Sequence, residues 1–174
     1  IAFQLAAITG GNNVGTTKTY LCNIGNHDVD RLASVVGDVQ GRLRVAAGIQ
    51  MTQPFPPSIW MGDELGMRGT KGNFGSDAND IPMREPFKWN AEHSTPMSNY
   101  WVLNNAAYTN RVSRDNDGRS VQEQTGVSGS VLETYRTLIS LRKNSVALRR
   151  GSYSPVSSPS SRVWTCVRAH AEQT

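Results

Sequence analysis

Two short apolar segments, each of which runs directly into polar or charged residues, place the strongest constraint on how this chain folds. Residues 19–24 (Thr-Tyr-Leu-Cys-Asn-Ile) form a strand candidate that is followed at once by Asn-His-Asp at 26–28. Residues 58–61 (Ser-Ile-Trp-Met) repeat this arrangement before Gly-Asp-Glu at 62–64. Charged residues immediately after short buried strands favour a parallel α/β barrel, in which the active site lies at the C-terminal ends of the strands.

Helical periodicity appears between these two segments and again near the C-terminus. Residues 39–51 are predicted to form a helix, whose small residues indicate close packing against a neighbour. One face of this helix carries Leu43, Ala46, Ala47 and Gln50. Prolines within residues 54–57 end the helix. Residues 131–144 restore the helical periodicity, with Lys143 near the negative end of the helix dipole.

The remaining segments differ in composition and define the predicted domains. Residues 66–116 are rich in Gly, Asn, Pro, Trp and Met, and loops of this length are usually functional. After Gly151, a Ser/Pro-rich segment precedes a strand candidate at 163–167, which indicates the start of an all-β domain. We therefore expect residues 1–150 to belong to the barrel and residues 151–174 to the β-domain. Because two parallel strands do not close a sheet, we expect the chain to be incomplete by itself.

Composition argues against several classes of function. The net charge is +4 and the pI about 9.3, but the arginines are scattered among acidic residues. This scatter favours a solvated surface over a nucleic-acid interface. No apolar run approaches the ~20 residues that a transmembrane helix needs, so no membrane is expected as a partner. Cys22 and Cys166 lie far apart and match no metal-binding spacing, so no metal site is predicted in this chain.

Five segments of the chain follow one another in an order that is specific to one enzyme family. In chain order they are residues 20–31, 42–47, 57–67, 80–89 and 135–153. They resemble the seventh barrel strand with its Asn-His-Asp ending, the seventh helix, the eighth strand, the loop after it, and the last helix of the α-amylase superfamily. The resemblance implies the C-terminal portion of a (β/α)8 TIM barrel, with strands 7 and 8 and their helices, followed by the beginning of an all-β domain.

The resemblance also assigns roles to the residues that follow the two strands. Cleavage of a glycosidic bond passes through an oxocarbenium-like state, in which positive charge develops at the anomeric carbon. Asp28 matches the carboxylate with which the family holds the hydroxyls of the sugar in this state. His27 matches a donor to sugar hydroxyls, and Asn26 is expected to support the turn. Independently of the resemblance, Asp63 and Glu64 are expected to act as ions that anchor the end of the second strand and its loop.

Two interpretations remain open for the candidate residues in the loop. Asp80 and Arg84 either line the subsites next to the cleaved bond or pair with each other across the loop. Trp89 and Trp101 either stack on sugar faces or pack within the protein, whereas core packing is favoured for Trp60. We take Asp80, Arg84 and Trp89 as substrate-binding candidates, together with the histidine of the Asn-His-Asp motif, and the loop as a wall that lines the sugar site.

The resemblance implies a retaining α-glucan hydrolase that acts on starch or malto-oligosaccharides; the alternative is a non-catalytic amylase-fold subunit that binds sugar or a partner. The family's nucleophile Asp and acid/base Glu lie on strands four and five, which this sequence lacks, so we expect the chain alone to be inactive. Its expected partners are the α-glucan and either the N-terminal part of the same enzyme or further copies of itself. No cofactor is expected in this chain. Calcium is expected in the preceding part of the enzyme, and a secreted or periplasmic location is expected.

Overall fold

The computed structural model describes residues 21–73, 77–98 and 115–172. Within these ranges the helices are α2 (Leu32–Val35), α3 (Gln40–Thr52), α4 (Val121–Gln124), α5 (Val131–Asn144) and α6 (Val146–Arg150), with the 3-10 helices η1 (Asp63–Leu65) and η2 (Asp77–Met83). Two strands follow, β1 (Ser152–Val156) and β2 (Thr165–Ala169). None of the helices in these ranges is long and apolar enough to cross a membrane.

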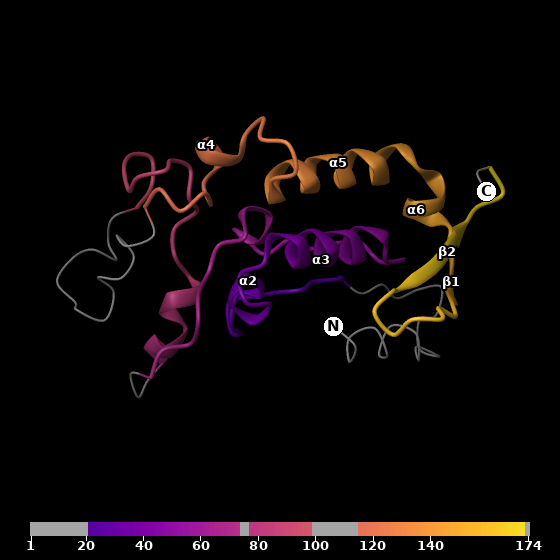
Figure 1. The fold of residues 1–174 in the computed structure, drawn as a ribbon, viewed down its shortest axis with the longest axis horizontal. Coiled ribbons are helices and arrows are strands. Elements are labelled where there is room, and N and C mark those ends of the chain that lie inside the picture. The colour runs from indigo at the N-terminus through magenta and orange to yellow at the C-terminus, as the bar shows by residue number, and fades with distance from the viewer. Residues whose placement is uncertain (1–20, 74–76, 99–114, 173–174) are drawn as a thin grey trace.

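Helices α3 and α5 lie side by side and form the main core of the described structure (Figure 1). Helix α3 contributes Leu43, Ala46 and Ala47, and α5 contributes Val131 and Tyr135, all of them buried. The two alanines are short, so the helix backbones approach each other closely. The predicted buried face of the helix at 39–51 and its packing against a neighbour are therefore confirmed.

The ends of α5 follow from local sequence. The Ser130 hydroxyl accepts a hydrogen bond from the Glu133 backbone N–H at 3.2 Å and so caps the N-terminus of the helix. Arg142 and Lys143 occupy the last turn, where positive charge is favourable. The predicted helix at 131–144 is confirmed with these bounds.

Gln50, which is fully buried on α3, connects the helical core to both predicted strands. Its side-chain amide donates to the Ser58 carbonyl at 2.8 Å and to the Cys22 carbonyl at 3.4 Å. Its oxygen accepts from the Tyr135 hydroxyl at 3.1 Å, and burial raises the pKa of that phenol above its usual range. The Gln50 side chain therefore holds both strand segments in a fixed position relative to α3 and α5.

The two predicted strands pair in parallel, but only over a single bridge between Cys22 and Pro57. Cys22 donates to the Pro56 carbonyl at 2.9 Å, and Ser58 donates to the Cys22 carbonyl at 2.8 Å. The prediction of full strands at 19–24 and 58–61 is therefore wrong for the described residues 21–24 and 58–61. Adjacent prolines explain the short pairing, because proline has no N–H to donate to a ladder.

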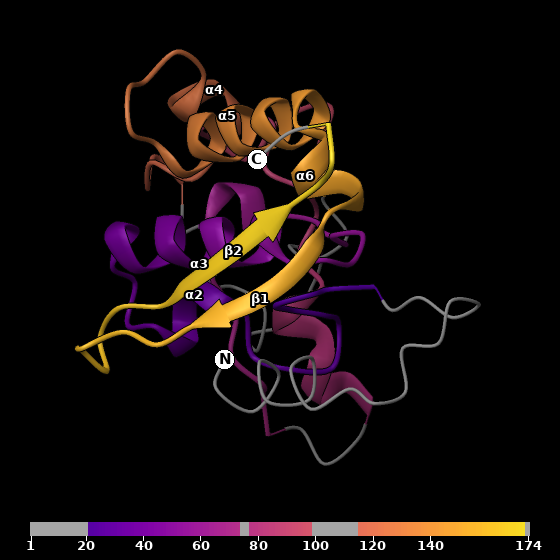
Figure 2. The ribbon, with the colours of Figure 1, turned by 90° about the vertical axis from the view of Figure 1, so that its right-hand side faces the viewer.

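The C-terminal strands form an antiparallel hairpin, in register from Ser152 opposite Ala169 to Val156 opposite Thr165. The hairpin lies at the end of the molecule where α3 ends (Figure 1), and it faces the viewer in Figure 2. The Arg168 guanidinium joins it to the helices by donating to the carbonyls of Thr52 and Gly151, at 2.9 and 2.8 Å. In the described residues this sheet has two strands, so the all-β domain from residue 151 onward stays a prediction.

The long loop predicted at 66–116 is irregular in its described parts, apart from η2. It is nevertheless anchored. Met83 is fully buried, and the buried Lys88 ammonium lies 2.6 Å from an oxygen of Asp117. The guanidinium of Arg68 lies 3.0 Å from the other oxygen of the same carboxylate. These contacts hold the loop against the segment that leads into α4.

Candidate active site

The Asn26–Asp28 turn places two polar side chains at the end of the first strand segment. The backbone N–H of Asp28 donates to Oδ1 of Asn26 at 2.8 Å, so Asn26 supports the turn as expected. His27 Nε2 lies 3.3 Å from Asp28 Oδ1. The side chains of His27 and Asp28 are 54% and 57% exposed, so both are open to a ligand.

Arg84 brings the loop to this turn. Its Nη2 lies 3.3 Å from Asp28 Oδ1 and 3.1 Å from Asp80 Oδ2, and its Nε donates to the His27 carbonyl at 3.4 Å. Lys71 Nζ lies 3.2 Å from the other oxygen of Asp80. The structure therefore brings together four of the predicted site residues. Asp80 and Arg84 do pair with each other, and Arg84 also contacts Asp28.

This group of charges is a surface feature. The Arg84 side chain is 43% exposed, and exposed ion pairs typically contribute less than about 1 kcal/mol to folding. Two carboxylates, Asp28 and Asp80, face two cations, Arg84 and Lys71, and Asp80 is the least exposed of the four at 17%. Such an arrangement is poorly suited to stabilising the fold and well suited to hydrogen bonding with hydroxyls.

Trp89 belongs to a different part of the loop. Its ring is 49% exposed and packs edge-on against Phe87, with 4.8 Å between the ring centroids. In the described structure no hydrogen bond, ion pair or ring contact joins Trp89 to Arg84, so its predicted sugar contact stays a prediction. Trp101 lies outside the described residues.

A buried group lies beneath the turn, and sequence reasoning did not identify its central residue, Arg31. The Arg31 side chain is fully buried and donates to the Met61 carbonyl at 2.7 Å. Its Nη1 lies 3.9 Å from Asp63 Oδ1. The only sequence signal for Arg31 is its position at the end of the 20–31 segment.

Asp63 and Glu64 are held at the end of the second strand segment, where they were expected to act as anchors. Burial raises the pKa of Asp63 to about 7, although the Arg31 charge opposes this shift. Burial also raises the pKa of Glu64, whose Oε2 accepts from the Gly62 backbone N–H at 2.8 Å. In the described residues, no group of three or more His, Cys, Asp or Glu side chains is arranged to hold a metal ion.

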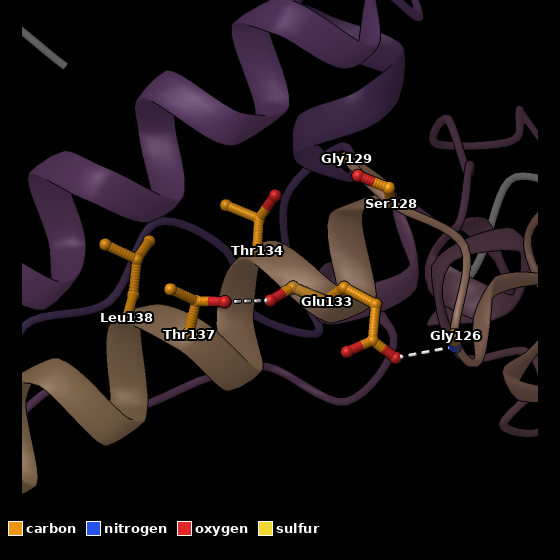
Figure 3. Close-up of a pocket in the computed structure, with 7 residues that line it drawn as sticks. All are labelled: Gly126, Ser128, Gly129, Glu133, Thr134, Thr137 and Leu138. Carbon is orange, nitrogen blue, oxygen red and sulfur yellow. Dashed lines mark hydrogen bonds between the residues drawn. The ribbon is translucent and has the colours of Figure 1, made fainter.

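A hollow of about 460 Å³ lies at the N-terminal half of α5 (Figure 3). Its lining residues are Gly126, Ser128, Gly129, Glu133, Thr134, Thr137 and Leu138. Glu133 closes the preceding loop by accepting from the Gly126 N–H at 2.9 Å. None of the predicted site residues lines this hollow.

Comparison with known proteins decides the family. The family model described as the alpha amylase catalytic domain matches residues 7–151. This chain belongs to the alpha-amylase superfamily of glycoside hydrolases. The resemblance predicted from the five ordered segments is thereby confirmed.

Two curated relatives and one solved structure show what share of its relatives this chain covers. Alpha-amylase SusG of Bacteroides thetaiotaomicron is 31% identical over 129 residues, which are 74% of this chain and 17% of that protein. Alpha-amylase 3 of Dictyoglomus thermophilum is 28% identical over 126 residues, 72% of this chain and 23% of that protein. The crystal structure of the α-amylase from H. orenii is similar with a TM-score of 0.69 and 28% identity, over 86% of this chain and 27% of that one. This likeness supports a fragment of a barrel.

Proposed function

We propose that this chain is the C-terminal part of the barrel of a retaining α-glucan hydrolase, followed by the start of a β-domain, and that Asp28 stabilises the transition state. The observation that carries the proposal is the meeting of Asp28, His27 and Arg84 at the end of a strand segment, with the first two half-exposed. A carboxylate in this position accepts hydrogen bonds from the sugar hydroxyls as positive charge develops on the ring.

The proposal gives each side chain a part. His27 Nε2 and Arg84 Nη2 both contact Oδ1 of Asp28, and neither of these contacts uses Oδ2. Oδ2 accepts from a sugar hydroxyl, and the half-exposed His27 ring supplies a donor to a neighbouring one. Arg84 orients the carboxylate and also holds Asp80 at the rim. Hydrogen bonds of this kind accelerate the reaction when they strengthen in the transition state.

The remaining catalytic groups are proposed to come from the N-terminal part of the same enzyme. The chain spans about a fifth of the length of the two curated α-amylases described above, at 17% and 23%. In the family the nucleophile and the acid/base lie on strands four and five, and both are needed for a double displacement. We therefore propose that this chain is inactive alone and contributes one carboxylate to a shared site.

The test is Asp28→Asn in the full-length enzyme that carries this chain, with malto-oligosaccharides as substrate. Loss of a preorganised electrostatic contact lowers turnover by about 10²–10³-fold, so we expect kcat to fall in that range while the melting temperature stays unchanged. Asp30→Asn is the matched control, because it removes the same charge two residues away, where Asp30 Oδ1 accepts from the Lys71 N–H at 2.7 Å.

Two results would contradict the proposal. An Asp28→Asn enzyme within threefold of the parent would remove Asp28 from the catalytic set. A full-length protein that binds malto-oligosaccharides but releases no product from them would favour the non-catalytic, sugar-binding alternative.

A further inference from the structure

We propose that Asp63, Arg31 and Trp60 form a support layer beneath the Asn-His-Asp turn that sets the orientation of His27 and Asp28. The inference builds on the proposed function, because it assigns positioning residues to the same site. None of the three side chains is proposed to touch the sugar.

The first link is between the two strand segments. Arg31 and Asp63 are 1% and 3% exposed, and Arg31 also donates to the Met61 carbonyl at 2.7 Å. A buried guanidinium is tolerated only where nearby groups compensate its charge. The turn that begins at the first strand segment is therefore fastened, through Arg31, to the end of the second.

The second link is to the backbone where the turn begins. A Cβ atom on Gly25 would lie 2.7 Å from Asp63 Oδ2, and a Cβ atom on Gly62 would lie 2.9 Å from Arg31 Nη1. Gly25 is therefore needed for Asp63 to fit against the start of the turn. Gly62 is required first by its left-handed backbone, at φ 95°, and by Met67, whose Sδ lies nearest to the added Cβ atom. Because Gly25 directly precedes the turn, the position of Asp63 fixes where the turn starts.

The third link is the Trp60 ring. The Arg31 guanidinium carbon lies 5.8 Å from its centroid, within the range of cation–π contact. The His27 ring centroid lies 5.8 Å from the same ring at an interplanar angle of 46°. His27 in turn contacts Asp28. Because His27 and Asp28 are half-exposed, their own packing holds them weakly, and this ring is the aromatic surface on which His27 rests.

Substitutions at Trp60 test the layer cleanly. In the described structure the indole N–H of Trp60 makes no hydrogen bond, so Trp60→Phe removes no polar contact while it keeps an aromatic ring. In the full-length enzyme we expect Trp60→Leu to lower kcat about tenfold with KM changed less than twofold. We expect Trp60→Phe to restore kcat to within threefold of the parent.

Leu65→Ala is the matched stability control. Leu65 is fully buried in η1 but belongs to the apolar cluster with Met67 and Leu132, so it tests loss of packing alone. All variants are assayed well below their melting temperatures. Equal losses of kcat in Leu65→Ala and Trp60→Leu would overturn the inference, as would failure of Trp60→Phe to restore activity.

A readout independent of turnover is the NMR signal of the His27 ring protons. Within the support layer, the Asp63 side chain is linked to the Trp60 ring through Arg31. We expect Asp63→Asn to shift the His27 signals through Arg31 and Trp60, whereas Leu65→Ala should leave them in place. Unchanged His27 signals in Asp63→Asn would overturn the inference. If Asp28→Asn abolishes activity and Trp60→Leu does not lower it, the support layer fails and the proposed function stands. If Asp28→Asn is fully active, the proposed function fails instead.

Discussion

Two arginine–aspartate pairs near the Asn26–Asp28 turn differ chiefly in how far water reaches them. The side chains of Arg84 and Asp28 are 43% and 57% exposed, whereas those of Arg31 and Asp63 are 0% and 1% exposed. The exposed pair is close, at 3.3 Å, and the buried pair is looser, at 3.9 Å. Yet the dry surroundings make the buried pair far more consequential for folding, because charges interact more strongly and are costlier to leave unpaired there.

The comparison shows how one chemical motif serves two purposes. Water screens the exposed pair, so a sugar hydroxyl can replace its hydrogen bonds at little cost. Water does not reach the buried pair, and the Asp63 oxygens make no hydrogen bond in the described structure. The buried pair therefore shapes the site and the exposed pair is available to a ligand. Three experiments break or sharpen this distinction.

The largest effect is expected from removing one partner of the buried pair. Arg31→Met leaves Asp63 without its counter-charge, and breaking a buried pair in this way typically costs about 3–5 kcal/mol. We expect the free energy of unfolding, measured by urea denaturation of the full-length protein, to fall by about that amount at pH 8. Arg84→Met is the matched variant at the exposed pair, and a loss there as large as in Arg31→Met would contradict the distinction.

A pH dependence is the second expected effect. The pKa of Asp63 is raised to about 7 from its ordinary value of 3.8, so the folded protein binds this proton more tightly than the unfolded chain. The stability from this group is therefore present below about pH 4 and is lost as the pH rises to about 7. Three pKa units set a ceiling of about 4 kcal/mol. We expect urea midpoints of the parent to fall from pH 5 to pH 7.5.

Asp63→Asn is the control for this pH dependence, since the amide does not titrate. Glu64 has its pKa raised by burial and contributes in the same direction, so the measured quantity is the difference between parent and variant. An identical pH slope in both proteins would show that Asp63 titrates as an ordinary exposed carboxylate.

The two long helices, α3 and α5, were predictable from sequence because their signals are local, whereas the short helices α2, α4 and α6 were not predicted. The apolar spacing and the Ser130 cap set α5, and the small residues at 46 and 47 set the buried face of α3. The turn with Asp28 was predictable for the same reason, since its Asn26 bond spans two residues. Asp80 and Arg84 stand four residues apart, so their pairing was also within reach of sequence reasoning.

The support layer was not predictable in the same way. Arg31 meets Asp63 across 32 positions of sequence, and nothing near Arg31 marks it as buried. The short strand pairing depends on the register between Cys22 and Pro57, which only the folded chain fixes. For Trp89 the sequence could not decide between two roles. An exposed aromatic residue in a loop is compatible both with packing inside the protein and with binding a sugar.

The smallest effect in free energy is expected at the exposed pair, where it appears in catalysis and not in folding. Arg84→Gln removes the charge that orients Asp28 and should lower kcat/KM on malto-oligosaccharides about tenfold, which corresponds to about 1.4 kcal/mol of transition-state stabilisation. The free energy of unfolding should change by less than about 0.5 kcal/mol, as for other exposed pairs. Arg136→Gln on α5 is the control, because Arg136 is also half-exposed and pairs with Glu133 at 2.6 Å away from the turn. If both variants lose activity equally, or if Arg84→Gln unfolds as readily as Arg31→Met, the exposed pair has a structural role and the two pairs differ only in degree.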